Sequence, residues 1–184
     1  MVTRQHVSPA AVKRLRQTLL YTLVVPLLVT VVVPLILHAV DQDPPPWSLG
    51  WWRWLGLVPL AFGAACYGWC ATSFAITGRG TPSPLDPPRS LLGHGCYRWT
   101  RNPIYVAIVA VLVGELMLFP AWLMLHYLAG SLVCMHLLVV LFEEPDLRRR
   151  FGPEYEQYCR QVPRWLGFRG LRATAIEPAR YASE

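Results

Sequence analysis

The sequence predicts an all-α integral membrane protein with about four transmembrane helices, a tight C-terminal helical hairpin and a cytoplasmic amphipathic C-terminal segment. Hydrophobic residues make up 54% of the 184 residues and charged residues only 15%, whereas ordinary soluble domains carry about 25% charged residues. Four apolar segments approach the roughly 20 residues that cross a bilayer. The net charge of +6 comes from basic residues that flank these segments, which favours orientation in a membrane over a nucleic-acid partner.

The first two apolar segments run from about Leu19 to Val40 and from about Leu55 to Ile76. The first is longer than the ~7–15 apolar residues of a signal peptide and no clear A-x-A site follows, so we expect a retained helix. Membrane helices tolerate prolines such as Pro26 and Pro34. Tryptophans precede the second segment, as interfacial anchors do: Trp47, Trp51, Trp52 and Trp54.

The third segment runs from Pro103 to near Phe119, and the fourth runs from about Ala121 to Phe142. Because almost nothing separates them, they should form a tight antiparallel hairpin. The third segment contains Glu115. A carboxyl group inside a membrane segment should face other helices or the interface rather than lipid.

Basic residues precede the first segment, lie between the second and third, and follow the fourth. These clusters are Arg4, Lys13, Arg14 and Arg16; Arg79, Arg89, Arg98 and Arg101; and Arg148, Arg149 and Arg150. With four crossings all three clusters share one side, which the positive-inside rule makes cytoplasmic. Both termini are then cytoplasmic, and the pattern fits a bacterial inner (plasma) membrane.

The segment after Glu144 has apolar residues at helical spacing and arginines on its other faces. The apolar positions are Leu147, Phe151, Tyr155, Tyr158 and Val162. This pattern predicts an amphipathic segment on the cytoplasmic face. Gly152 and Pro153 should break it into two short helices.

The cysteines predict neither a disulfide framework nor a metal site. There are five of them, an odd number, and no CxxC pair occurs. Cys66 and Cys70 lie one helical turn apart in an apolar segment and are interpreted as core residues. The five histidines are scattered and form no HExxH motif, so we expect no bound metal.

Two polar motifs stand at the ends of the hairpin: "RNPIY", from Arg101 to Tyr105, and "FEEPD", from Phe142 to Asp146. The structural interpretation of the first is a helix start, with Asn102 as N-cap and Pro103 in the first helical position. Arg101 would then be an interfacial arginine and Tyr105 a belt aromatic. The two glutamates would end the fourth helix, where the dipole disfavours carboxylates, so Arg101 or Arg98 should offset them.

The functional interpretation follows from the hairpin, which brings both motifs to the same membrane face. A helix N-terminus with an arginine can bind a carboxylate, and paired glutamates can bind an ammonium group. The methionine part of S-adenosylmethionine carries both groups. Tyr97, Trp99 and Tyr105 would contact its sulfonium and adenine by cation–π attraction and stacking.

Two stretches carry a family resemblance: "GCYRWTRNPIY" and, after the hairpin, "EEPDLRRRFGPEYEQYCRQVPRWL". Together they resemble the integral-membrane methyltransferases related to isoprenylcysteine carboxyl methyltransferase and the phospholipid N-methyltransferases. That family shares an R-(H/N)-P-x-Y motif, an apolar hairpin, a Glu-Glu pair and a tail of the form FGxxYxxYxxxVPR. The resemblance covers about Gly78 to Gly167, roughly half of the chain.

The resemblance implies a methyltransferase core over residues 78–172, preceded by two membrane helices in residues 1–77 and followed by a loose tail, 173–184. It implies S-adenosylmethionine bound at the cytoplasmic side and a lipophilic small-molecule or lipid acceptor that enters from the bilayer. Matching motif positions imply cofactor contacts from Leu92, Tyr97, Asn102, Pro103, Tyr105 and Glu143. The charge argument adds Arg101 and Glu144.

Two departures from the family pattern bear on the acceptor. Asn102 stands where histidine is commonest, which argues against an imidazole base there. Val139 stands where the prenylcysteine branch has an arginine, so a prenylcysteine substrate is not predicted. The acceptor, the methylated element (oxygen, nitrogen or sulfur) and the catalytic base are left open.

Two alternative functions also stay open. Membrane sterol- or isoprenoid-type reductases resemble the same C-terminal region and bind NADPH, although they are usually longer. A non-enzymatic membrane scaffold would keep Arg101 and Glu143 only as a structural pair across the interface.

Overall fold

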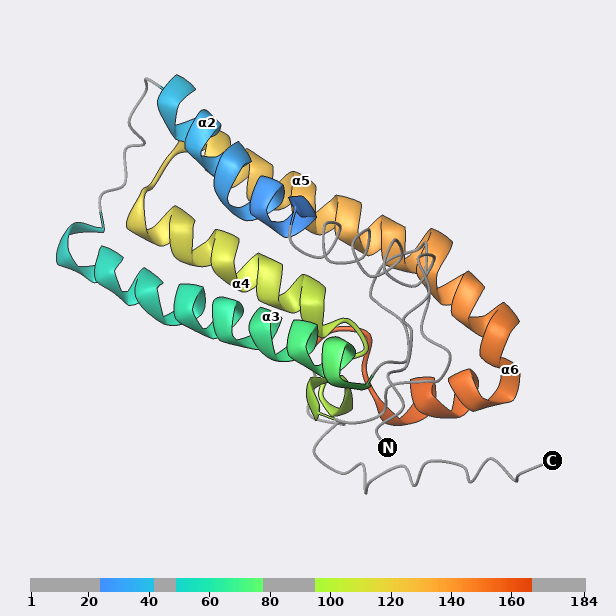
Figure 1. Ribbon diagram of the computed structural model, residues 1–184. Coiled ribbons are helices and arrows are strands. Elements are labelled where there is room, and N and C mark those ends of the chain that lie inside the picture. The colour runs from blue at the N-terminus through green and yellow to red at the C-terminus, as the bar shows by residue number, and fades with distance from the viewer. Residues whose placement is uncertain (1–23, 42–48, 78–94, 167–184) are drawn as a thin grey trace, which may run out of the picture.

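The computed structural model describes residues 24–41, 49–77 and 95–166, and all regular structure within these ranges is helical (Figure 1). This confirms the predicted all-α class. In chain order the elements are η1 (Leu28–Val32), α2 (Val33–Val40), η2 (Gly50–Gly56), α3 (Leu57–Thr77), η3 (Gly95–Arg98), α4 (Pro103–Leu118), α5 (Trp122–Leu138), η4 (Val139–Glu143) and α6 (Glu144–Gln161).

Two helices in the described ranges are long and apolar enough to cross a membrane: Gly50–Ser73 and Trp122–Gln161. Two shorter apolar helices, Val24–Val40 and Pro103–Leu118, accompany them. Each predicted apolar segment is therefore helical where it is described. Their outer faces carry many exposed large apolar side chains, which is typical of a surface covered by lipid. Four crossings and cytoplasmic termini stay predictions.

Helices α4 and α5 form the predicted hairpin, with the turn at Phe119 and Pro120 (Figure 1). Ile108 and Leu112 of α4 form a core with Met124 and Leu128 of α5. One carboxyl oxygen of Glu115 is buried and has no hydrogen-bond partner among the described residues. This confirms that the carboxyl group faces protein rather than lipid.

The first described helix packs beside α5 (Figure 1). The Tyr127 hydroxyl donates to the carbonyl oxygen of Val29 at 2.9 Å, and the Leu123 amide donates to the Asp41 carboxylate at 2.9 Å. Contacts at two heights fix this helix along α5. The hairpin is therefore covered on one side by the first helix and on another by α3.

Helices α3 and α4 approach each other closely because glycines lie at two levels of their contact: Gly56 faces Gly114, and Gly63 faces Ala107. A Cβ atom on Gly63 would lie 2.5 Å from the carbonyl oxygen of Ala107, and one on Gly114 would lie 2.6 Å from that of Gly56. Small residues allow such backbone contact between membrane helices. This contact places the end of α3 beside the start of α4.

The helix that contains the fourth apolar segment does not end at the paired glutamates, so the predicted helix end there is wrong. Helix α5 continues through the π-helical turn η4 directly into α6. Pro145 has no backbone N–H, so one hydrogen bond of the helix is lost there. The wide i→i+5 turn just before it accommodates this loss. Glu143 and Glu144 therefore lie within a continuous helix rather than at its negative end.

Gly152 breaks α6 as predicted, with φ +49° and ψ −124°. After the break the chain turns back towards the start of α4 (Figure 1). Tyr155, Tyr158 and Val162 form a small core with Leu147 and Phe151 on the other side of the break. The predicted apolar face of the C-terminal segment is confirmed.

We expect Gly63→Ala to lower the melting temperature of the detergent-purified protein. The added methyl group meets the α4 backbone, and such overpacking costs about 1–3 kcal/mol. Gly68→Ala is the matched control on the same helix, since nothing lies within 4 Å of its Cβ position. The control should melt at the same temperature or higher. Equal melting temperatures for both variants would contradict the close α3–α4 contact.

Candidate functional site

The "RNPIY" stretch starts α4 as predicted, with Asn102 at the N-cap and Pro103 in the first turn. The Asn102 side chain does not cap the helix. Its amide nitrogen donates instead to the carbonyl oxygen of Arg164 at 3.0 Å, and the Thr100 hydroxyl donates to the same oxygen at 3.0 Å. The Arg101 amide donates to the carbonyl of Pro163 at 3.0 Å. The entry to α4 is thus bound to the chain that follows α6.

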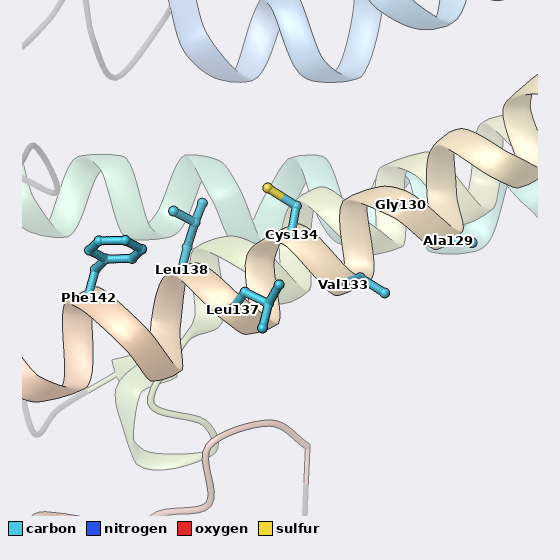
Figure 2. A pocket seen from close by; sticks show the side chains of 7 residues that line it. All are labelled: Ala129, Gly130, Val133, Cys134, Leu137, Leu138 and Phe142. Carbon is cyan, nitrogen blue, oxygen red and sulfur yellow. The ribbon is translucent and has the colours of Figure 1, made fainter.

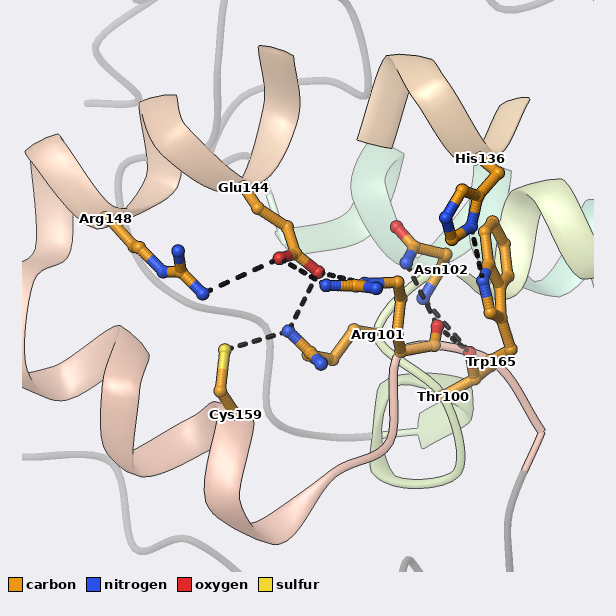
Figure 3. A network of polar contacts seen from close by, with 9 residues as sticks. Thr100, Arg101, Asn102, His136, Glu144, Arg148, Cys159 and Trp165 are labelled. Carbon is orange, nitrogen blue, oxygen red and sulfur yellow. Dashed lines mark hydrogen bonds and ion pairs between the residues drawn. The ribbon is translucent and has the colours of Figure 1, made fainter. Parts of the chain in front are cut away.

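The Glu144 carboxylate is the centre of a charged network with Arg101, Arg148 and Arg164, which we call the Glu144 network (Figure 3). Arg164 binds both carboxylate oxygens, with Nε–Oε1 at 2.6 Å and Nη2–Oε2 at 3.0 Å. Arg101 Nη1 lies 3.0 Å from Oε1, and Arg148 Nη2 lies 3.7 Å from Oε2. The predicted pairing of Arg101 with the glutamates is confirmed at Glu144.

Burial makes this network energetically important. The Glu144 side chain is 5% exposed and that of Arg101 is 12% exposed. Glu144 begins α6, beyond the apolar part of its helix. Burial by itself would raise the pKa of Glu144, but the hydrogen bond from Arg164 and the three guanidinium charges lower it overall. The same hydrogen bond raises the pKa of Arg164. Glu144 therefore stays ionised at neutral pH.

Glu143 points to a different partner from Glu144. The Tyr105 hydroxyl of α4 donates to Glu143 Oε1. Consecutive helical residues project about 100° apart, so one glutamate faces α4 while the other faces the arginines. Tyr105 holds one end of the Glu143 carboxylate at the polar end of the hairpin.

The C-terminal chain covers this region from the other side. The Tyr158 hydroxyl donates to the carbonyl oxygen of Tyr97 at 2.8 Å. Arg101 Nη1 also contacts Cys159 Sγ at 2.9 Å. Arg101 Nε is buried and has no hydrogen-bond partner among the described residues. The site therefore holds a buried guanidinium nitrogen without a hydrogen-bond acceptor among the described residues.

Six of the predicted site residues take part in contacts around the start of α4 and the η4–α6 junction: Tyr97, Arg101, Asn102, Tyr105, Glu143 and Glu144. Pro103 is fully buried in the first turn of α4. Leu92 lies outside the described residues. The sequence prediction missed Arg148 and Arg164. The arginine after "VP" in the tail motif was the available signal for Arg164.

A shallow, open apolar groove lies along one exposed face of α5 and η4. Cys134, Leu138 and Phe142 point to the same side of the helix (Figure 2). The groove ends at Phe142, directly before Glu143 in the chain. An apolar surface thus leads along the helix to the polar site.

Comparison with known proteins identifies one family. The family model for phospholipid methyltransferase matches residues 51–154. The match runs from η2 through the hairpin into α6 and includes both "RNPIY" and the two glutamates. Neither a curated protein nor a solved structure matches the chain significantly.

We expect Glu144→Gln to destabilise the protein by about 3 kcal/mol or more, because it leaves buried arginine charge without its partner. Asp146→Asn is the control. Asp146 forms an ion pair with Arg150 at 2.9 Å, and both side chains are at least 40% exposed, so its loss should cost less than about 1 kcal/mol. Thermal melts in one detergent measure both variants. Equal losses would contradict a central role for Glu144.

The Glu144 network should also give stability a defined dependence on pH. A carboxylate with a lowered pKa in the folded state stabilises that state above its ordinary pKa of about 4.3, and this contribution is lost as pH falls through the folded value. The melting temperature of the wild type should therefore fall more steeply below pH ~4.3 than that of Glu144→Gln. Parallel curves for the two proteins would refute the ionised network.

Proposed function

The chain belongs to the phospholipid methyltransferase family, and we propose that it transfers a methyl group from S-adenosylmethionine to a small lipophilic or lipid-head-group acceptor. The observation that supports this most is the placement of opposite charges at the polar end of an apolar hairpin. Arg101 has a buried donor with no partner among the described residues, and the Glu143 carboxylate is held nearby by Tyr105. A cationic donor and a carboxylate acceptor together suit the carboxylate and the ammonium group of an amino acid.

The residues present fit the methionine part of the cofactor. Arg101 Nε is suited to the carboxylate, and the Glu143 carboxylate is suited to the ammonium group. The rings of Tyr97, Trp99 and Tyr105 would contact the sulfonium and the adenine. Pro103 and Asn102 would shape the floor of the site, and Leu92 is included on the sequence motif alone.

Glu144 takes a different part in this proposal from the one first predicted for it. Its oxygens are bound by Arg101, Arg164 and Arg148, so it is a positioning residue rather than an ammonium ligand. It holds the guanidinium of Arg101 through Nη1 and leaves Nε without an acceptor among the described residues. Loss of Glu144 should therefore act on the cofactor through Arg101.

When bound, S-adenosylmethionine would supply a methyl group that is activated for transfer by the positive charge on its sulfur. The chain's residues then have to orient the two molecules and exclude water. The C-terminal segment closes one side of the site. The Tyr158 hydroxyl donates to the Tyr97 carbonyl oxygen, and the Asn102 side chain donates to the Arg164 carbonyl oxygen. We assign no catalytic base.

We further propose that the acceptor's apolar part lies in the groove on α5 (Figure 2). The groove is open on the side of the helix where lipid would lie, and Phe142 at its end directly precedes Glu143 in the chain. The proposed topology has four crossings with both termini in the cytoplasm of a bacterium. It is supported by Arg98, Arg101 and Arg148, which lie at one end of the hairpin.

The first test is the melting temperature of the full chain in detergent with S-adenosylmethionine, S-adenosylhomocysteine, NADPH or no ligand. A ligand at 100 times its Kd stabilises the folded state by about 2.7 kcal/mol. We expect both sulfur nucleosides to raise the melting temperature and NADPH to leave it unchanged. A rise with NADPH alone would support a reductase instead, and no rise with any ligand would support a scaffold.

The second test assigns the site. Glu143→Gln should weaken S-adenosylhomocysteine binding at least tenfold, because an ammonium contact to a carboxylate is replaced by one to a neutral amide. Glu156→Gln, an exposed acidic residue of α6, is the control and should bind like the wild type. Calorimetry on both proteins measures the difference. Unchanged affinity in Glu143→Gln would remove Glu143 from the proposed site.

A further inference from the structure

Three cysteines that the proposed methyl transfer does not use lie together beside the candidate site. Cys66 and Cys70 come from α3 and Cys96 comes from η3, and their sulfur atoms all lie within 4.8 Å of one another. Cys70 is 1% exposed and the other two are half-buried. All three are free thiols. The sequence analysis interpreted two of them as core residues and expected no bound metal.

The local structure explains why these thiols meet. Cys66 and Cys70 are four residues apart and so lie on one face of α3. Gly95, at the start of η3, has φ +63°, a conformation that glycine adopts readily, and a Cβ atom on it would lie 3.3 Å from Trp69 Nε1 of α3. The Cys66 thiol also donates to the carbonyl oxygen of Pro103 at 4.0 Å. The three sulfurs thus join α3 to the chain segment that precedes α4.

We propose that Cys66, Cys70 and Cys96 bind one soft divalent cation of the zinc and cadmium class. Zinc–sulfur bonds are about 2.3 Å long, so tetrahedral geometry needs sulfurs about 3.8 Å apart. The observed spacing is within about 1 Å of that requirement, which small rotations of the side chains can supply. Three thiolates are ligands that soft cations prefer and that magnesium and calcium do not.

The site also has a route to solvent and room for a fourth ligand. A recess of about 360 Å³ adjoins Cys96 and is lined by Trp69, Gly95, Cys96, Arg98 and Trp99. A water molecule from this recess would complete the tetrahedron. Binding releases three protons from the thiols to solvent, forms three metal–sulfur bonds and changes no oxidation state. The resulting centre carries one negative charge, and Arg98 lines the recess beside it.

The arrangement favours a metal over a disulfide. A disulfide joins two sulfurs at about 2.05 Å and leaves the third unused, whereas a cation uses all three after small rotations of the side chains. It also fits the reducing cytoplasmic side of the proposed topology. A bound cation would fix η3, and with it Tyr97 and the entry to α4, against α3. Metal binding does not depend on the proposed function, because no cofactor or acceptor group takes part.

The test is a titration of the full chain in detergent with Cd²⁺ under reducing conditions, followed by thiolate-to-metal charge-transfer absorption. We expect one Cd²⁺ per chain and a higher melting temperature in its presence. Cys66→Ser, Cys70→Ser and Cys96→Ser should each weaken binding at least tenfold. Cys134→Ser is the matched control, since Cys134 is an exposed thiol on α5, and it should bind like the wild type.

Cd²⁺ should also displace Zn²⁺ from protein loaded with Zn²⁺, because thiolates prefer the softer cation, and the absorption band should then appear. Cys70 is fully buried, so the half-buried Cys96 gives the decisive variant if Cys70→Ser does not fold. Wild-type affinity in Cys96→Ser, or equal loss in Cys134→Ser, would overturn the site. Loss of the thiols to a disulfide before Cd²⁺ is added would overturn it as well. Cofactor binding is measured separately, so failure of either proposal can be told from failure of the other.

Discussion

The buried carboxylate of Glu144 is the interaction on which the polar end of the molecule depends. It sits where an apolar helix continues into α6, and it is almost fully enclosed by protein. A charge in such a place is tolerated only when it is paired and hydrogen-bonded. Arg101, Arg148 and Arg164 supply the pairing among the described residues. Because these arginines come from three parts of the chain, satisfying one carboxylate brings the hairpin, α6 and the tail together.

The apolar contacts give this network its fixed position. The glycines of α3 and α4 allow backbone contact, so the start of α4 has little freedom relative to α3. The hairpin then carries the η4–α6 junction to the level of Arg101. Turning back at Gly152 lets Tyr158 reach Tyr97 and lets the Arg164 carbonyl reach Asn102. A polar site at a membrane surface is thus held by helix packing on one side and by a short folded tail on the other.

Much of the fold was predictable because it depends on local sequence. The lengths of the apolar segments predicted the helices, the short break at Phe119 predicted the hairpin, and Gly152 predicted the bend in α6. The hairpin also predicted that Arg101 would meet a glutamate. What the sequence did not reveal depends on side-chain direction and on tertiary contacts. Neighbouring helical residues point in different directions, and this decides that Glu144 rather than Glu143 contacts Arg101. Arg164 comes from an irregular segment, whose path cannot be predicted from a periodic sequence pattern.

The cysteines show the same limit in another form. Cys66 and Cys70 carry a visible helical spacing, but Cys96 comes from a non-periodic segment and lies after a long connection. No spacing rule joins it to α3. The helix end that was wrongly predicted at the glutamates has another cause. Pro145 is an ordinary stop signal, but the wide turn of η4 lets the helix continue through it.

The π-helical turn η4 has a consequence for how this sequence can vary in length. A wide turn holds one residue more than the α-helix around it, and each residue rotates the remainder of the helix by about 100°. Deleting one position between Val139 and Phe142 would remove that extra residue, restore regular helix and leave both glutamates on about the same faces. The same deletion in the regular turns of α5 would rotate both glutamates by about 100°, away from α4 and the arginines. Natural variants of this chain that differ by one residue between the hairpin turn and the glutamates should therefore carry that difference within η4.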